Sequence, residues 1–67
     1  MKIERDGTGG FLLHADEREL LLINNAINEI CNGIRIDDFE TRVGVPLTEA
    51  EMVLKTVGKA LDASRYN

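Results

Sequence analysis

The sequence is poor in the residues that small proteins use as covalent or metal staples. Its 67 residues include one cysteine, Cys31, and one histidine, His14. A single cysteine excludes an internal disulfide, and the sequence has no cluster of Cys and His that could hold a structural zinc ion. A domain this short buries only about 60% of the surface that its unfolded chain exposes. We therefore expect helix packing or oligomerisation to provide stability, with a homodimer as the default.

Aromatic residues and long apolar runs are also scarce. Phe11, Phe39 and Tyr66 are the only aromatics, so the core must be aliphatic. The longest apolar run, residues 20–23, is far shorter than the ~20 residues that a membrane span requires. No apolar segment follows Lys2 as it would in a signal peptide. We expect no membrane partner, and the unpaired cysteine agrees with a cytoplasmic location.

Positive charge is in deficit. The formal net charge is −4 and the sequence pI is about 4.8, which disfavours attraction to nucleic acid for the molecule as a whole. Hydrophobic residues make up 43% and charged residues 30%, a globular rather than a disordered composition.

Few side chains suit catalysis. No motif places a nucleophile or carboxylate beside His14, and Cys31 falls next to an apolar helical stripe, where an inert buried thiol is the simpler interpretation. The carboxylates sit mostly at helix starts, where capping explains them. We expect no enzyme activity and no catalytic, cofactor-binding or metal-ligating residues.

Residues 2–14 predict a β-hairpin. Residues 2–5 and 11–14 favour strands, and the run from Asp6 to Gly10 between them is rich in residues that adopt the positive φ angles of tight turns. A phosphate-binding loop does not fit this run, because no Gly-Lys-Ser/Thr ending follows it and the chain has no room for a βαβ unit.

Three helix starts share one signature. A residue able to cap a helix is followed three positions later by a glutamate that can bond back to it. The pairs are Asp16 with Glu19, Asp37 with Glu40, and Thr48 with Glu51. With the apolar spacing that follows each, they predict helices over residues 17–32, 38–43 and 49–63, and Gly33 and Gly44 are placed to end the first two.

We therefore expect a single domain over residues 1–67, α+β but mostly α. It consists of an N-terminal β-hairpin followed by three helices, the last two helix-turn-helix-like. Residues 37–54 resemble a helix-turn-helix through a short helix, the turn glycine Gly44 and an apolar residue before a capped second helix. Glu49 and Glu51, however, open the second helix where a DNA reader needs Arg, Lys, Asn or Gln.

The first predicted helix carries a second candidate surface. Its main apolar stripe contains Leu20, Ile23, Ile27 and Ile30. Leu21, Leu22, Asn25 and Asn28 point elsewhere, and asparagine is a poor helix former. Either these four residues form a partner-binding face, or the leucines lie under the hairpin and the asparagines are merely solvated; we weigh the two equally.

The segments Asn25–Gly33 and Phe39–Val45 (NAINEICNG and FETRVGV) look like a pattern in small uncharacterised bacterial proteins of similar length and layout. The resemblance spans roughly residues 11 to 61. It implies a bacterial or phage origin and a stand-alone chain, and it carries no activity, site or substrate.

The leading hypothesis is a small acidic protein–protein interaction module of the immunity-protein, antitoxin or inhibitor type. One alternative is a dimeric helix-turn-helix regulator that binds DNA, for which Arg35, Arg42, Lys55 and Lys59 would have to gather on one face. Another is a structural subunit whose hairpin adds strands to a neighbouring sheet.

Overall fold

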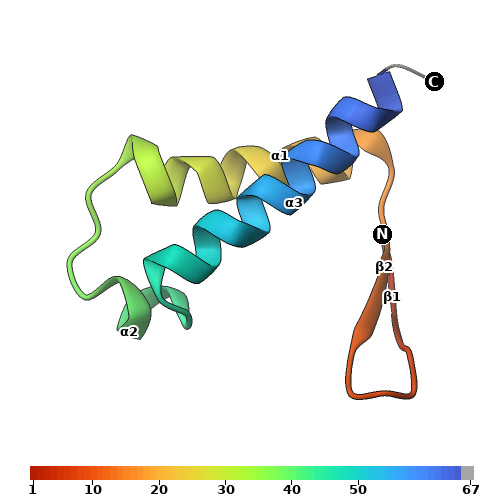
Figure 1. The fold of residues 1–67 in the computed structure, drawn as a ribbon, viewed down its shortest axis with the longest axis horizontal. Helices are drawn as coiled ribbons and strands as arrows, with labels where there is room; N and C mark the ends of the chain where they lie inside the picture. Colours follow the sequence, from red (N-terminus) through yellow and green to blue (C-terminus); the bar gives the residue numbers. More distant parts are fainter. Residues whose placement is uncertain (66–67) are drawn as a thin grey trace.

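The computed structural model describes residues 1–65 and shows a two-stranded antiparallel hairpin followed by three α-helices (Figure 1). The predicted fold class is therefore confirmed. The elements are β1 (Lys2–Arg5), β2 (Phe11–His14), α1 (Glu17–Asn28), the π-helical turn η1 (Glu29–Gly33), α2 (Phe39–Val43) and α3 (Leu47–Arg65).

The hairpin forms over the predicted strands, residues 2–5 and 11–14. Ile3 pairs with Leu13 and Arg5 with Phe11. The turn between the strands is organised by the carboxylate of Asp6, whose Oδ1 accepts hydrogen bonds from the Thr8 amide at 2.8 Å, the Thr8 hydroxyl at 2.7 Å and the Gly10 amide at 3.1 Å. The turn is thus defined by a side chain bonding to its own loop, as Asp commonly does.

The start of α1 confirms the first capping prediction. Asp16 Oδ1 accepts a hydrogen bond from the Glu19 amide at 2.8 Å, and Glu19 Oε1 accepts one from the Asp16 amide at 3.0 Å. The other carboxylate oxygen of Glu19 lies 2.7 Å from the amino group of Met1. One glutamate therefore both closes the capping box and ties the first residue of the hairpin to the helix.

The other two capping predictions are wrong. Helix α2 begins at Phe39, so the residue at its cap is Asp38 and not the predicted Asp37; Asp38 has φ 53° and ψ 49° and makes no side-chain capping bond. An N-cap needs an extended backbone to aim its side chain at the helix amides, and the left-handed conformation does not provide it. Helix α3 begins at Leu47, because the Pro46 carbonyl accepts from the Glu49 and Ala50 amides. Thr48 therefore lies inside the first turn and not at its cap.

The end of the first helical segment also differs from expectation. Residues 29–33 widen into a π-helical turn, closed by a hydrogen bond from the Ile34 amide to the Glu29 carbonyl at 3.0 Å. Gly33 lies inside this turn and is not among the glycines with positive φ, so it is not the left-handed residue that we expected there. The wider turn satisfies the last carbonyls without a glycine cap.

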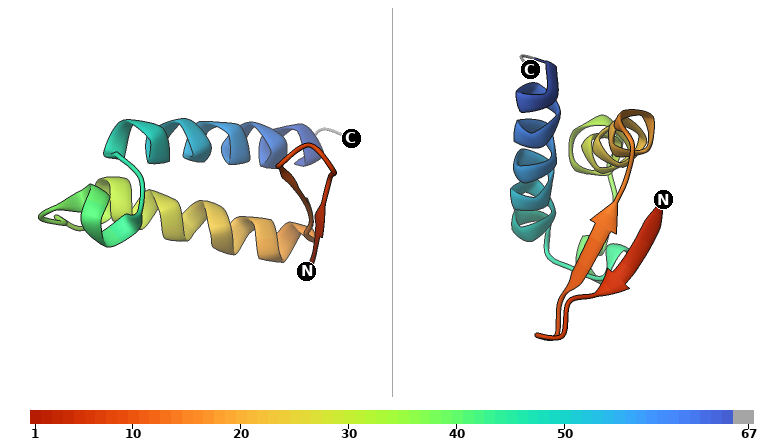
Figure 2. Two further views of the ribbon diagram at one scale, coloured as in Figure 1. Left: turned by 90° about the horizontal axis from the view of Figure 1, so that it is seen from below. Right: turned by 90° about the vertical axis from the view of Figure 1, so that its right-hand side faces the viewer.

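Helix α3 packs along α1, and this contact forms most of the core (Figure 2). Ala50 and Leu61 are the most buried hydrophobic side chains in the described part of the chain, at 5% and 4% exposure. The main apolar stripe predicted on the first helix (Leu20, Ile23, Ile27 and Ile30) is half-buried, and so are Leu54 and Val57 on α3. The core is therefore a single thin seam between two helices.

The connection from α2 to α3 has the order expected of a helix-turn-helix. Gly44 has φ 99°, as a turn glycine should, and its amide bonds to the Glu40 carbonyl at 2.8 Å. The short α2 does not provide the main support of α3, which comes from α1. The likeness is thus one of element order and turn geometry.

The chain is less compact than its size allows. The hairpin projects from one end of the helix pair and α2 lies at the other end (Figure 1). The radius of gyration is 13.2 Å, whereas a compact chain of 67 residues has about 11 Å. The accessible surface is 5561 Å², compared with about 4,200 Å² for a compact monomer of this mass.

Replacing Gly58 by alanine should stabilise the protein. Gly58 lies within α3 opposite α1, and a β carbon there would lie 3.7 Å from Asn24 Oδ1, an ordinary contact. Because alanine restricts the unfolded chain and favours the helix, Gly58→Ala should raise the free energy of unfolding by about 0.5 to 1 kcal/mol. Urea unfolding followed by circular dichroism at fixed protein concentration measures this change.

The matched control is Gly44→Ala, the same chemical change at a positive φ. It should lower the free energy of unfolding by about 1 to 2 kcal/mol, because a β carbon is strained in the left-handed region. Destabilisation by Gly58→Ala would mean that α1 and α3 cross more closely than the structure shows.

Candidate interaction surface

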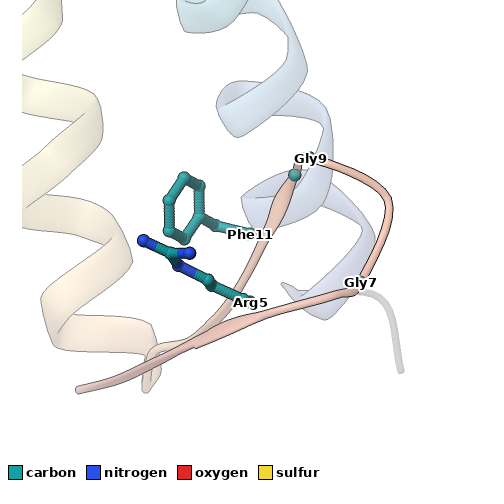
Figure 3. A pocket seen from close by; sticks show the side chains of 5 residues that line it. Arg5, Gly7, Gly9 and Phe11 are labelled. Carbon is teal, nitrogen blue, oxygen red and sulfur yellow. The ribbon is translucent and has the colours of Figure 1, made fainter.

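The two faces of the hairpin differ in character. Side chains alternate along a strand, so the register places Ile3, Arg5, Phe11 and Leu13 on one face. We call these four residues the apolar hairpin face. Arg5 and Phe11 project from the same side of the hairpin and lie alongside each other (Figure 3).

The apolar hairpin face is open to solvent. Phe11 is 60% exposed, Ile3 58% and Leu13 56%. A hollow of about 420 Å³ lies against Arg5, Phe11 and the glycines of the turn (Figure 3). All of the residues that line this hollow belong to the hairpin. The two strands contact each other far more than they contact the helices.

The glycine turn beside this hollow is already occupied by a carboxylate. The amides of Thr8 and Gly10, which a phosphate would need, donate to Asp6. An anion would have to displace that carboxylate and then face its negative charge. The local hydrogen bonding therefore supports the view that this is a hairpin turn rather than a phosphate-binding loop.

The opposite face of the hairpin is mostly polar. Glu4 bridges two cationic or neutral partners, with Oε1 2.9 Å from Lys2 Nζ and Oε2 3.1 Å from His14 Nε2. Leu12 shares this face and is 51% exposed. Glu4 is thus already paired with Lys2 and His14 within the hairpin. Burying these polar groups under a partner would cost free energy of desolvation, whereas covering the apolar face would not.

A second exposed apolar area lies on α3. Met52, Val53, Thr56 and Val57 surround a shallow hollow of about 310 Å³, with Glu49 at its N-terminal end. We call these five residues the α3 hollow. Met52 is 70% exposed and Val53 is 47% exposed. Ala50 and Leu61 on the same helix are buried, so the hollow lies beside the side of α3 that packs on α1, with the half-buried Val57 at the border between the two.

The Leu/Asn face predicted on α1 is exposed. Leu22 is 70% exposed and Leu21 39% exposed, and both Asn25 and Asn28 are exposed. The leucines therefore do not lie buried under the hairpin, and the asparagines are solvated. The side-chain oxygen of Asn28 accepts a hydrogen bond from Asn32 Nδ2 at 3.0 Å.

The residues proposed for DNA binding come from three different elements. Arg35 lies in the loop before α2, where Nε is 3.7 Å from Asp37 Oδ1. Arg42 is in the last turn of α2, and Lys55 and Lys59 are one turn apart on α3. Glu49 and Glu51, both exposed, stand in the first turns of α3.

The structure gives no indication of a metal or membrane site in residues 1–65. Over that range no three His, Cys, Asp or Glu side chains gather closely enough to hold a metal ion. Cys31 is half-buried. None of the described helices has the length and apolar content of a membrane crossing.

Comparisons with protein-family models, with curated proteins and with solved structures found no significant match to this chain. The surface must therefore be interpreted from its own geometry and chemistry.

The carboxylates of Asp6 and Glu19 predict a loss of stability in acid. Hydrogen bonds from the Thr8 hydroxyl and amide lower the pKa of Asp6, and the bond from the Met1 amino group lowers the pKa of Glu19. A pKa that is lower in the folded state gives stability that is present above the ordinary carboxyl range of about 4 and is lost as the pH falls through the folded pKa. The melting temperature should therefore fall between about pH 5 and pH 3.

The double variant Asp6→Asn, Glu19→Gln should show a shallower fall of melting temperature over the same pH range. Glu17→Gln is the control, because Glu17 also lies in the first turn of α1 but makes no side-chain hydrogen bond or ion pair with the described residues. If the melting temperature of the double variant falls with pH as steeply as that of the wild type, Asp6 and Glu19 are not the cause of the acid destabilisation.

Proposed function

We propose that this chain is a protein–protein interaction module that acts by direct contact through an apolar surface. The observation that carries the proposal is the exposure of Ile3, Phe11 and Leu13 on one hairpin face, in a chain whose seam between α1 and α3 is its only substantial core within the described residues. Contiguous exposed apolar side chains of this kind mark interaction sites in proteins.

The extent of the surface supports the same proposal. The chain exposes about 1,300 Å² more than a compact monomer of its mass. A standard protein–protein interface buries about 800 Å² on each partner. The elongated shape therefore leaves room for an interface of ordinary size.

The charge supports a role toward a basic partner. With a net charge of −4 and exposed carboxylates at the starts of α1 and α3, the helical part suits a partner with a positive patch, as for an immunity protein, antitoxin or nuclease inhibitor. DNA binding receives less support, because Glu49 and Glu51 would face phosphates at the start of α3 and repel them.

A pull-down with matched hairpin variants tests the interaction module. Phe11 and Leu12 are adjacent, are exposed to similar extents and lie on opposite hairpin faces. Tagged wild type, Phe11→Glu and Leu12→Glu would be incubated with nuclease-treated and untreated native extract. We expect the wild type and Leu12→Glu to retain the same proteins under both conditions, and Phe11→Glu to lose at least about 80% of them, because a buried charge without a partner disrupts an apolar contact.

Retention that is equal for the two variants would contradict a role for the apolar hairpin face. Retention that disappears on nuclease treatment would contradict the protein-interaction proposal and favour the DNA-binding alternative. Far-UV circular dichroism of each variant checks that the helices remain folded.

A further inference from the structure

We infer that the partner of the apolar hairpin face is a second copy of this chain, and that the hairpin of each copy docks on the α3 hollow of the other. This inference rests on the proposed function and specifies its partner. It places Phe11 over the hollow formed by Met52, Val53 and Thr56, and Arg5 beside Glu49.

The two surfaces are complementary in chemistry. Each is apolar at its centre, with the exposed Phe11 on the hairpin and the exposed Met52 and Val53 on the helix. Each carries one charge at its margin, and the charges are opposite. Neither Arg5 nor Glu49 has an ion-pair partner among the described side chains, so both are available to pair across an interface.

Contact between the two surfaces within one chain is excluded by their positions. The hairpin lies at the end of the helix pair where α1 begins and α3 ends, whereas residues 49–57 form the opposite half of α3, toward α2 (Figures 1 and 2). The molecule is 37 Å long, and each four-residue strand extends only about 13 Å. Two copies related by a twofold axis can satisfy both surfaces at once.

The distribution of charge favours this arrangement over contact through α1 or α2. Residues 1–14 carry two basic and two acidic side chains and residues 47–67 carry three of each, whereas residues 15–46 carry seven acidic and three basic ones. The net charge of −4 thus lies outside both the hairpin and α3. A neutral hairpin and a neutral α3 can approach each other without net repulsion, whereas contact through α1 or α2 would bring two acidic segments together.

The elongated shape leaves surface that association can cover. The chain exposes about 1,300 Å² more than a compact monomer of its mass, and a standard interface buries roughly 800 Å² on each partner. A twofold pair makes the hairpin contact twice, so it buries both copies' apolar hairpin faces in one closed assembly.

Charge reversal on each surface tests the contact. Arg5→Glu and Glu49→Arg each place like charges together at both contacts of a homodimer, so each should weaken dimerisation at least about tenfold. In an equimolar mixture of the two variants, one contact pairs Glu at position 5 with Arg at position 49, and the other is native. The mixture should therefore dimerise within about threefold of the wild type. Sedimentation equilibrium of the full chain over a concentration series measures all four states.

Two controls carry the same charge changes elsewhere. Lys2→Glu lies on the other hairpin face, and Glu51→Arg lies on α3 outside the α3 hollow. Both should dimerise like the wild type. Circular dichroism of each variant checks the helical content, and rescue on mixing by itself shows that the weakened variants are folded.

The outcomes distinguish this inference from the proposed function. Rescue by the double variant Arg5→Glu, Glu49→Arg but not by mixing would place the contact within one chain and overturn the inference. A wild-type chain that is monomeric at millimolar concentration, or one that grows into open polymers, would also overturn it. If the monomeric chain still retains other proteins through Phe11, the interaction module stands and only the identity of its partner is wrong.

Discussion

The contact between α1 and α3 is the interaction on which the rest of this small structure depends. It is a single seam of aliphatic side chains in which Ala50 and Leu61 are the most buried. A seam of this width covers one side of each helix and leaves the other sides in solvent. The hairpin and α2, at opposite ends of the seam, add little apolar burial of their own.

The hairpin is consequently held by polar and local interactions more than by packing. Asp6 organises its turn, Glu4 links Lys2 and His14 across one face, and Glu19 anchors Met1 to the start of α1. A two-stranded hairpin without a packed face is marginal in water. These contacts order the hairpin in the isolated chain, which would reduce the entropy lost if it docked on a partner.

Sequence reasoning succeeded where the signal was local. The glycine-rich turn fixed the ends of β1 and β2, and the Asp16 box was found because both of its members act within one turn of helix. It failed where a neighbouring residue changed the backbone. Asp38 adopts a left-handed conformation that turns its side chain from the amides of α2, and Pro46 provides the carbonyl that starts α3 early.

The candidate surface was only partly predictable for a different reason. The Leu/Asn face of α1 could be found from helical spacing, because residues off the main stripe must lie elsewhere. The exposure of Phe11 and Leu13 could not, since an alternating strand pattern shows which side chains share a face but not whether the helices cover it. The α3 hollow could not be predicted from the sequence either. The helical position of Val53 fits both the side of α3 that packs on α1 and the exposed side that lines the hollow.

The acidic side chains and the apolar hairpin face lie on different parts of the molecule, and this separation restricts the kinds of surface that the hairpin can contact. The acidic excess lies on the helical part, and the apolar hairpin face contains a single charge, that of Arg5. A cation at the edge of an apolar surface stays hydrated until it meets a carboxylate, so it penalises partners that offer none. The hairpin therefore suits an apolar surface that offers a carboxylate, and the α3 hollow combines apolar side chains with Glu49. The carboxylates of Glu49 and Glu51 also disfavour a polyanion at the start of α3.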